Sequence, residues 1–188
     1  MLLCRGWCCV RPTIVKNAGQ KRFPTYHFSG LAQPAMWRVQ SLFWPKRTLP
    51  PALSLKLTVA KRDEFPEPGH IYIAPGGSHL RLNGLHRFEF SANPTNVPHI
   101  PSGDSLLESV ARSYGSHSVG VVLTGMGDDG ANGLRFMYDV GAMTIAQDEA
   151  TSVVFGMPRE AIARGAARQV LPLSNIAREL NRIARPRG

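Results

Sequence analysis

The chain has 188 residues, of which 43% are hydrophobic and 19% charged, with 18 glycines and 15 prolines. This composition excludes a disordered tail, a collagen-like rod and a coiled coil, and the length favours one domain. No apolar run approaches the roughly 18 residues that cross a bilayer, and Arg5 interrupts the start, which makes a poor secretion signal. The three cysteines are crowded near the start and predict no disulfide framework. We therefore expect a cytoplasmic protein without membrane insertion.

The charge is distributed unevenly along the chain, although the formal net charge is +9. Residues 1–62 contain eleven Lys or Arg and no acidic residue, whereas residues 63–188 contain eleven Arg and thirteen Asp or Glu. About one residue in eight is acidic in ordinary proteins, so 62 residues without one indicate two compositions joined near residue 60. We expect residues 1–52 to be an atypical basic segment and residues 53–188 to be a folded domain.

Four interpretations of this basic segment compete. A nucleic-acid-binding arm would rarely carry three tryptophans and so many apolar residues, which makes nucleic acid a poor candidate for a partner. An organelle transit peptide would contain more serine. The other two interpretations are a diverged part of the fold and a sequence read in an altered frame or from a misplaced start. The last is favoured, because the segment has little periodicity and its prolines interrupt every candidate helix.

Before residue 100, the sequence predicts β-structure. Apolar and polar residues alternate over 53–60, which indicates a strand. The remaining elements are a short strand over 70–74, a β-hairpin that pairs 79–82 with 87–90 across Asn83-Gly84, and a loop over 91–100.

After Pro101 the sequence predicts helices that alternate with buried strands. The first helix starts at a capping box formed by Ser105 and Glu108 and ends at Gly115. The later elements are a strand over 118–124, a helix over 131–140, a strand over 143–146, a helix from Pro158 to about 164, a strand over 169–173 and a last helix capped by Ser174. This order predicts an α/β fold with a doubly wound, mostly parallel sheet, helices on both faces and a small β-hairpin.

The loop over 124–130, Thr-Gly-Met-Gly-Asp-Asp-Gly, follows a predicted buried strand, at the end of a parallel sheet where ligands gather. Its glycine spacing fits a dinucleotide-binding fingerprint, but Asp128 and Asp129 would repel the pyrophosphate. A Mg²⁺ site lacks a spaced partner carboxylate. The simplest alternative is a turn whose aspartates cap the next helix.

The surrounding residues favour a catalytic interpretation. The segments 124–133, 141–147 and 152–161 closely resemble the catalytic domain of the CheB family of chemotaxis protein-glutamate methylesterases, and 68–76 and 99–104 extend the match. The resemblance implies a doubly wound α/β sheet and hydrolysis of glutamate methyl esters on chemoreceptors by a Ser-His-Asp triad. It also implies that methylated cytoplasmic receptor helices are the partner. No cofactor or metal is expected.

Two residues carry the site that this resemblance implies. Asp129 matches the acid of the triad, which holds the histidine and stabilises the imidazolium. The backbone N–H of Met126, in a glycine-flanked turn, is expected to donate to the oxyanion. Asp128 occupies a variable position and is expected to be a solvated cap.

The resemblance stops before the nucleophile and the base. The family's Gly-x-Ser-Thr-Gly-Gly and Gln-His motifs would fall near residues 11–14 and 36–38, where neither occurs, and His27 and Ser29 lie in the wrong order. We therefore expect a chain that is inactive or nearly so. The alternatives are a non-catalytic receptor-binding remnant and nucleic-acid binding through residues 1–62.

The other histidines offer no replacement base. Three of them, His70, His79 and His86, are expected to be exposed residues in or beside the hairpin. His99 matches a family position and has a possible structural or substrate-side role, and His117 is expected to be solvated. The cysteines lack a second pair of metal ligands.

Overall fold

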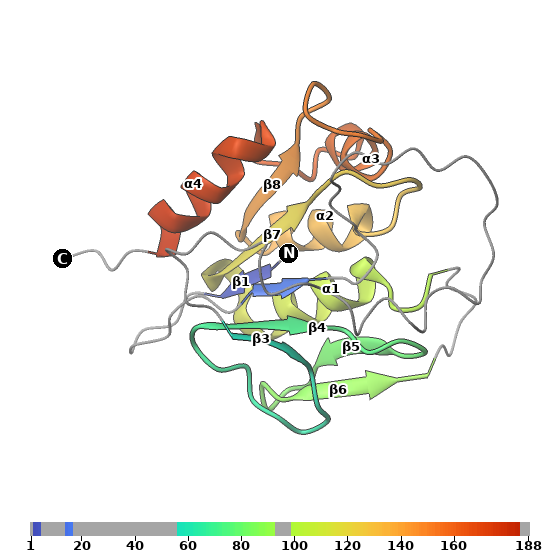
Figure 1. The fold of residues 1–188 in the computed structure, drawn as a ribbon, viewed down its shortest axis with the longest axis vertical. Helices are drawn as coiled ribbons and strands as arrows, with labels where there is room; N and C mark the ends of the chain where they lie inside the picture. The colour runs from blue at the N-terminus through green and yellow to red at the C-terminus, as the bar shows by residue number, and fades with distance from the viewer. Residues whose placement is uncertain (1, 5–13, 17–55, 93–98, 185–188) are drawn as a thin grey trace.

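The computed structural model describes residues 2–4, 14–16, 56–92 and 99–184. A seven-stranded sheet has the order β3-β4-β2-β1-β7-β8-β9, and strands β5 and β6 form a separate pair (Figure 1). The strands are β1 (Leu2–Cys4), β2 (Ile14–Lys16), β3 (Lys56–Val59), β4 (His70–Ile73), β5 (His79–Leu82), β6 (Phe88–Ser91), β7 (Ser118–Val122), β8 (Met143–Gln147) and β9 (Gln169–Leu171). The helices are α1 (Gly103–Tyr114), the short 3₁₀ helix η3 (Gly115–His117), α2 (Ala131–Asp139), α3 (Met157–Ala163) and α4 (Leu173–Ala184).

The sheet is mostly parallel, as the sequence predicts. Strands β3, β4 and β2 run parallel to one another, and so do β7, β8 and β9. Strand β1 joins the two groups and is antiparallel to both of its neighbours.

Strand β7 is buried along its whole length because helices cover both faces of the sheet. Val119 and Val121 pack into a hydrophobic cluster with Ile176 and Leu180 of α4. Gly120 faces the other way, and a Cβ built on it would lie 2.6 Å from the sulfur of Met137 in α2. The doubly wound α/β architecture is therefore confirmed, and it brings the end of β7 to the rim of the sheet.

The starts of two helices differ from the prediction. Helix α1 has Ser102, not Ser105, as its N-cap, and the Ser102 hydroxyl accepts a hydrogen bond from the Ser105 N–H at 3.3 Å. Helix α4 begins at Leu173, and the carbonyl of Pro172 accepts the N–H groups of Asn175 and Ile176. Ser174 therefore lies inside the first turn rather than at its cap.

Several strands end earlier than the sequence predicts, although β8 extends one residue further, to Gln147. Strand β7 stops at Val122, and β9 stops before Pro172, which has no N–H to donate. In the hairpin, the second strand is displaced by one residue, to 88–91. The reason is a longer turn, in which the Asn83 side chain accepts the N–H groups of Leu85 and Arg87.

None of the described helices has the length and apolar character that a membrane crossing requires.

Candidate active site

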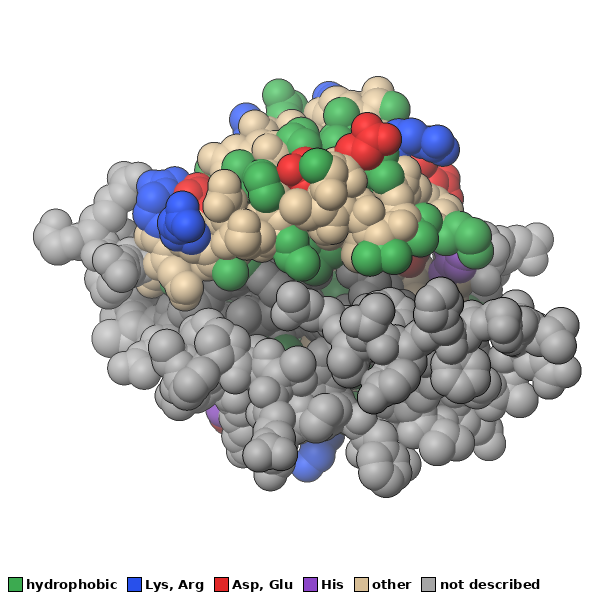
Figure 2. Space-filling model, turned by 45° about the horizontal axis from the view of Figure 1, so that its top comes forward, with side chains coloured by type: hydrophobic (Ala, Val, Ile, Leu, Met, Phe, Trp, Pro, Cys, Tyr) green, Lys and Arg blue, Asp and Glu red, His purple; other side chains and the backbone are tan. Residues whose placement is uncertain are grey.

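The candidate site lies on the turn between β7 and α2, at the carboxyl rim of the sheet. Strands β7 and β8 point toward the top of Figure 1, and Figure 2 turns that top forward. In the described part of this rim, Figure 2 shows hydrophobic side chains among acidic and other side chains. Met126 and Val153 are the most exposed large apolar residues at this rim, with exposed fractions of 85% and 76%. The turn predicted to carry chemistry is thus accessible from solvent.

The Asp129 carboxylate is held against the start of α1. Its Oδ1 accepts the Ser102 hydroxyl at 2.8 Å and the Asp104 N–H at 3.1 Å, and its Oδ2 accepts the Gly103 N–H at 2.7 Å. Free N–H groups and the partial positive charge of a helix start both stabilise a carboxylate there. The geometry therefore gives Asp129 one fixed orientation while it remains only partly buried.

This contact corrects one alternative drawn from the sequence. An aspartate in such a turn is expected to cap the helix that follows it, but the N-cap of α2 is Gly130, at φ 91°, without a capping side chain. Asp129 instead caps α1, which starts 26 residues earlier in the chain. Asp128 is exposed as expected, yet it caps no helix through its side chain, which binds Arg164 at 2.8 Å. That hydrogen bond with Arg164 lowers the pKa of Asp128.

Asp104, in the first turn of α1, makes the complementary contact with α2. Its carboxylate accepts the Gly133 N–H at 2.7 Å and the side-chain amide of Asn132 at 3.3 Å. Burial raises the pKa of Asp104, the hydrogen bond from Gly133 acts against that rise, and the nearby charge of Asp129 adds to it. The two carboxylates thus tie the starts of α1 and α2 together.

His79 is buried behind this cluster, so the expectation of an exposed histidine is wrong. Its exposed fraction is 2%, and its Nδ1 accepts the Ser102 N–H at 3.1 Å. A neutral ring that accepts at Nδ1 carries its proton on Nε2. Among the described residues no hydrogen-bond partner faces this Nε2 atom. Sequence alternation could not find His79, because its burial comes from helix α1 packing on β5.

The exposure of the other described histidines follows the expectation more closely. His86 and His117 are exposed as expected, whereas His70 is partly buried. His99 is exposed beside the turn, with its Nε2 atom 3.8 Å from the position that a Cβ on Gly127 would take. The positions 11–13 and 36–38, His27 and Ser29 lie outside the described residues.

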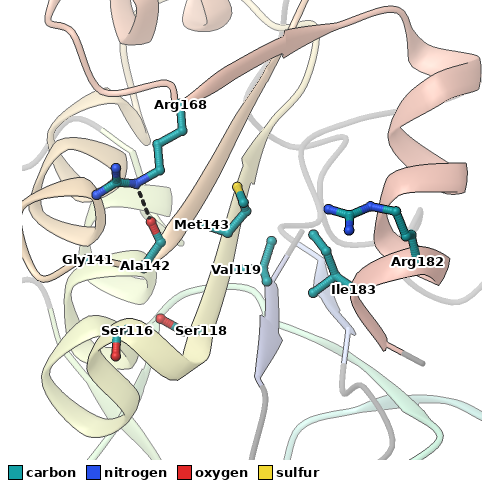
Figure 3. A pocket seen from close by; sticks show the side chains of 9 residues that line it. All are labelled: Ser116, Ser118, Val119, Gly141, Ala142, Met143, Arg168, Arg182 and Ile183. Carbon is teal, nitrogen blue, oxygen red and sulfur yellow. Dashed lines mark hydrogen bonds between the residues drawn. The ribbon is translucent and has the colours of Figure 1, made fainter. Parts of the chain in front are cut away.

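A cavity of about 380 Å³ lies at the opposite end of the strands and does not belong to this site (Figure 3). Ser118 and Met143, which line it, are the first residues of β7 and β8. The Arg168 guanidinium at its edge is directed to the Ala142 carbonyl at 2.9 Å. Within the described part of the chain, no three His, Cys, Asp or Glu residues gather in a way that could hold a metal.

The sequence profile of the CheB methylesterase family matches residues 45–180. The chain belongs to the CheB methylesterase family. The crystal structure of the Thermotoga maritima CheB methylesterase catalytic domain superimposes with a TM-score of 0.66 at 36% identity, covering 69% of this chain and 70% of that one.

Among curated CheB relatives, the protein-glutamate methylesterase FrzG of Myxococcus xanthus is 50% identical over 127 residues, which are 68% of this chain and 38% of FrzG. A protein-glutamate methylesterase/protein-glutamine glutaminase of Shewanella denitrificans is 48% identical over 133 residues, with 69% and 38% coverage. The chain thus spans little more than a third of the length of these relatives. The resemblance and the fold predicted from the sequence are confirmed, whereas the division at residue 52 and the roles of Asp129 and Met126 stay predictions.

Proposed function

We propose that this chain carries the acid and the oxyanion donor of a protein-glutamate methylesterase site. In a complete site of this kind, the Asp129 carboxylate would accept the Nδ1–H of a histidine, and the Met126 N–H would stabilise the negative charge on the ester oxygen. The observation that carries it is the Asp129 carboxylate, which three donors hold at the carboxyl rim, three residues after the exposed Met126. Family membership gives the reaction class, hydrolysis of a carboxylic ester.

A fixed acid is what this chemistry needs. In a Ser-His-Asp site the carboxylate holds the imidazole in the useful tautomer and stabilises its cation, so a freely rotating carboxylate would serve poorly. Three donors from the start of α1 limit the rotation of Asp129. The three hydrogen bonds occupy both lone pairs of Oδ1 and one of Oδ2, which leaves a lone pair on Oδ2 for one further donor.

We further propose that the 188-residue chain has little or no turnover. Neither Gly-x-Ser-Thr-Gly-Gly nor Gln-His occurs anywhere in its sequence. Removing nucleophile and base together from a related type of site costs about 10⁶ in kcat, leaving only the contributions of binding and of the oxyanion donor.

We propose that the partner is a methylated helix of a chemoreceptor and that the chain binds it in the cytoplasm. The support is the methylesterase activity named for the relatives. If the rim retains affinity without turnover, the chain is a receptor-binding remnant, which is the second candidate function.

A receptor-derived helical peptide that carries a glutamate γ-methyl ester tests both candidates. We expect the immobilised peptide to retain the chain while no methanol is released above background. Methanol release at the rate of a complete relative would overturn the proposed inactivity. Failure to retain the chain would overturn the receptor-binding candidate.

A further inference from the structure

The backbone N–H and carbonyl of Gly125 are both held by a second loop, residues 154–157, which leads into α3. The Gly125 N–H donates to the Val154 carbonyl at 3.0 Å. The Gly125 carbonyl accepts two hydrogen bonds, from the Gly156 N–H at 3.1 Å and the Met157 N–H at 2.8 Å. Gly125 and Phe155 also form an isolated parallel bridge. The loop therefore extends the pairing of the sheet to the turn.

These contacts fix the direction of the Met126 N–H. The Gly125 carbonyl and the Met126 N–H belong to one planar trans peptide group, so they point in opposite directions. Because the carbonyl points at the start of α3, the N–H points to the other side of the turn. Among the described residues, no backbone acceptor faces this N–H.

The close approach of the two loops requires a glycine at position 156. A Cβ there would lie 2.6 Å from the Gly125 oxygen and 3.2 Å from both the Gly127 nitrogen and the Met126 Cα. All three are backbone atoms, so the turn itself would have to move. The φ of Gly156 is −100°, which any residue adopts, so space and not backbone freedom is the constraint.

We propose that Gly156 is a positioning residue for the oxyanion donor. By lacking a side chain, it lets the start of α3 hold the Gly125 carbonyl and thereby aims the Met126 N–H. This inference rests on the role proposed above for Met126. The coupling between residue 156 and the Met126 amide can be measured without any turnover. Failure of this inference is therefore distinguishable from failure of the proposed function.

The Gly156→Ala variant of the ¹⁵N-labelled full chain tests the coupling by NMR. The matched control is Gly120→Ala, because a Cβ on Gly120 also meets an atom at 2.6 Å, but in the core below α2. We expect Gly156→Ala to shift the Met126 and Gly127 amide signals. We also expect it to accelerate exchange of the amides of residues 156 and 157 about five- to tenfold, the factor that one lost hydrogen bond corresponds to. The control should leave these four signals in place.

A second variant covers the case in which Gly156→Ala does not fold. The Thr124 hydroxyl accepts the Val154 N–H at 2.8 Å and donates to the Val154 carbonyl at 3.1 Å, so Thr124→Val loosens the same loop with little change in volume. It should move the Met126 amide signal in the direction that Gly156→Ala does. The proposal is overturned if the foldable variants move this signal no more than Gly120→Ala does.

Discussion

Asp129 and Asp104 cap each other's helices. Asp129, just before α2, accepts the Gly103 and Asp104 N–H groups at the start of α1, and Asp104 accepts the Gly133 N–H in the first turn of α2. Asp129 thus stabilises the start of α1, and Asp104 stabilises the start of α2. The consequence is that the proposed catalytic acid is also part of the contact between α1 and α2.

Replacing Asp129 should therefore destabilise the fold as well as remove the acid. In Asp129→Ala the N–H groups at the start of α1 lose their acceptor, and we expect a loss of about 1–3 kcal/mol in the free energy of unfolding. The control is Asp128→Ala, which breaks an exposed ion pair with Arg164 and should cost less than about 1 kcal/mol. Urea unfolding of both variants measures the difference. Equal losses would contradict the capping role of Asp129.

The raised pKa of Asp104 predicts a pH dependence of stability. Burial is its main cause, so the folded chain holds the Asp104 proton more tightly than the unfolded chain does. Stability should then fall as the pH rises from about 4, the usual value for aspartate, through the raised pKa, and level off above it. Asp104→Asn should lack this decline, because an amide does not titrate in this range. Its amide oxygen can still accept the Gly133 N–H, so the contact itself is kept.

Urea unfolding between pH 4 and 7 measures that slope. Asp139→Asn, which alters an exposed aspartate at the end of α2, is the matched control and should keep the decline of the unaltered chain. A decline of the same size in Asp104→Asn would show that another group causes it.

The contact between α1 and α2 depends on Gly133. A Cβ there would lie 2.8 Å from the Asp104 carbonyl oxygen and 2.8 Å from the Leu107 Cβ. Gly133→Ala should push the helices apart at a cost of about 1–3 kcal/mol, in the range of other overpacked cores. Gly84→Ala, at a hairpin position with no atom within 4 Å, provides the comparison and should stay close to the unaltered chain in thermal unfolding. A similar Tm for both variants would argue against a tight contact.

Local patterns predicted the central elements because those elements depend on local rules. The apolar run of β7 and the stop at Gly141, where φ is 83°, identified a buried strand and the end of the following helix. The start of α1 was misplaced by a capping box at Ser105, although Ser102 and Asp129 together satisfy the first N–H groups. The part of this cap that Asp129 supplies comes from another segment and leaves no signal in the sequence around the helix.

The same limit applies to the contacts behind the site. Nothing near His79 indicates that its Nδ1 meets the Ser102 N–H, because the two residues meet only after β5 packs on α1. The Gly156 contact with Gly125 likewise joins two loops 31 positions apart. Family motifs pointed to Asp129 and Met126, but only the assembled fold supplies the groups that orient them.

The most direct test of the account is methanol release from a glutamate γ-methyl ester peptide by the purified 188-residue chain, compared with its Asp129→Asn variant. The account predicts that neither protein releases methanol faster than the peptide alone, because the sequence contains neither the Gly-x-Ser-Thr-Gly-Gly nor the Gln-His motif of the family. The account would be contradicted if the unaltered chain released methanol and the Asp129→Asn variant did not. A complete triad would then operate within these 188 residues.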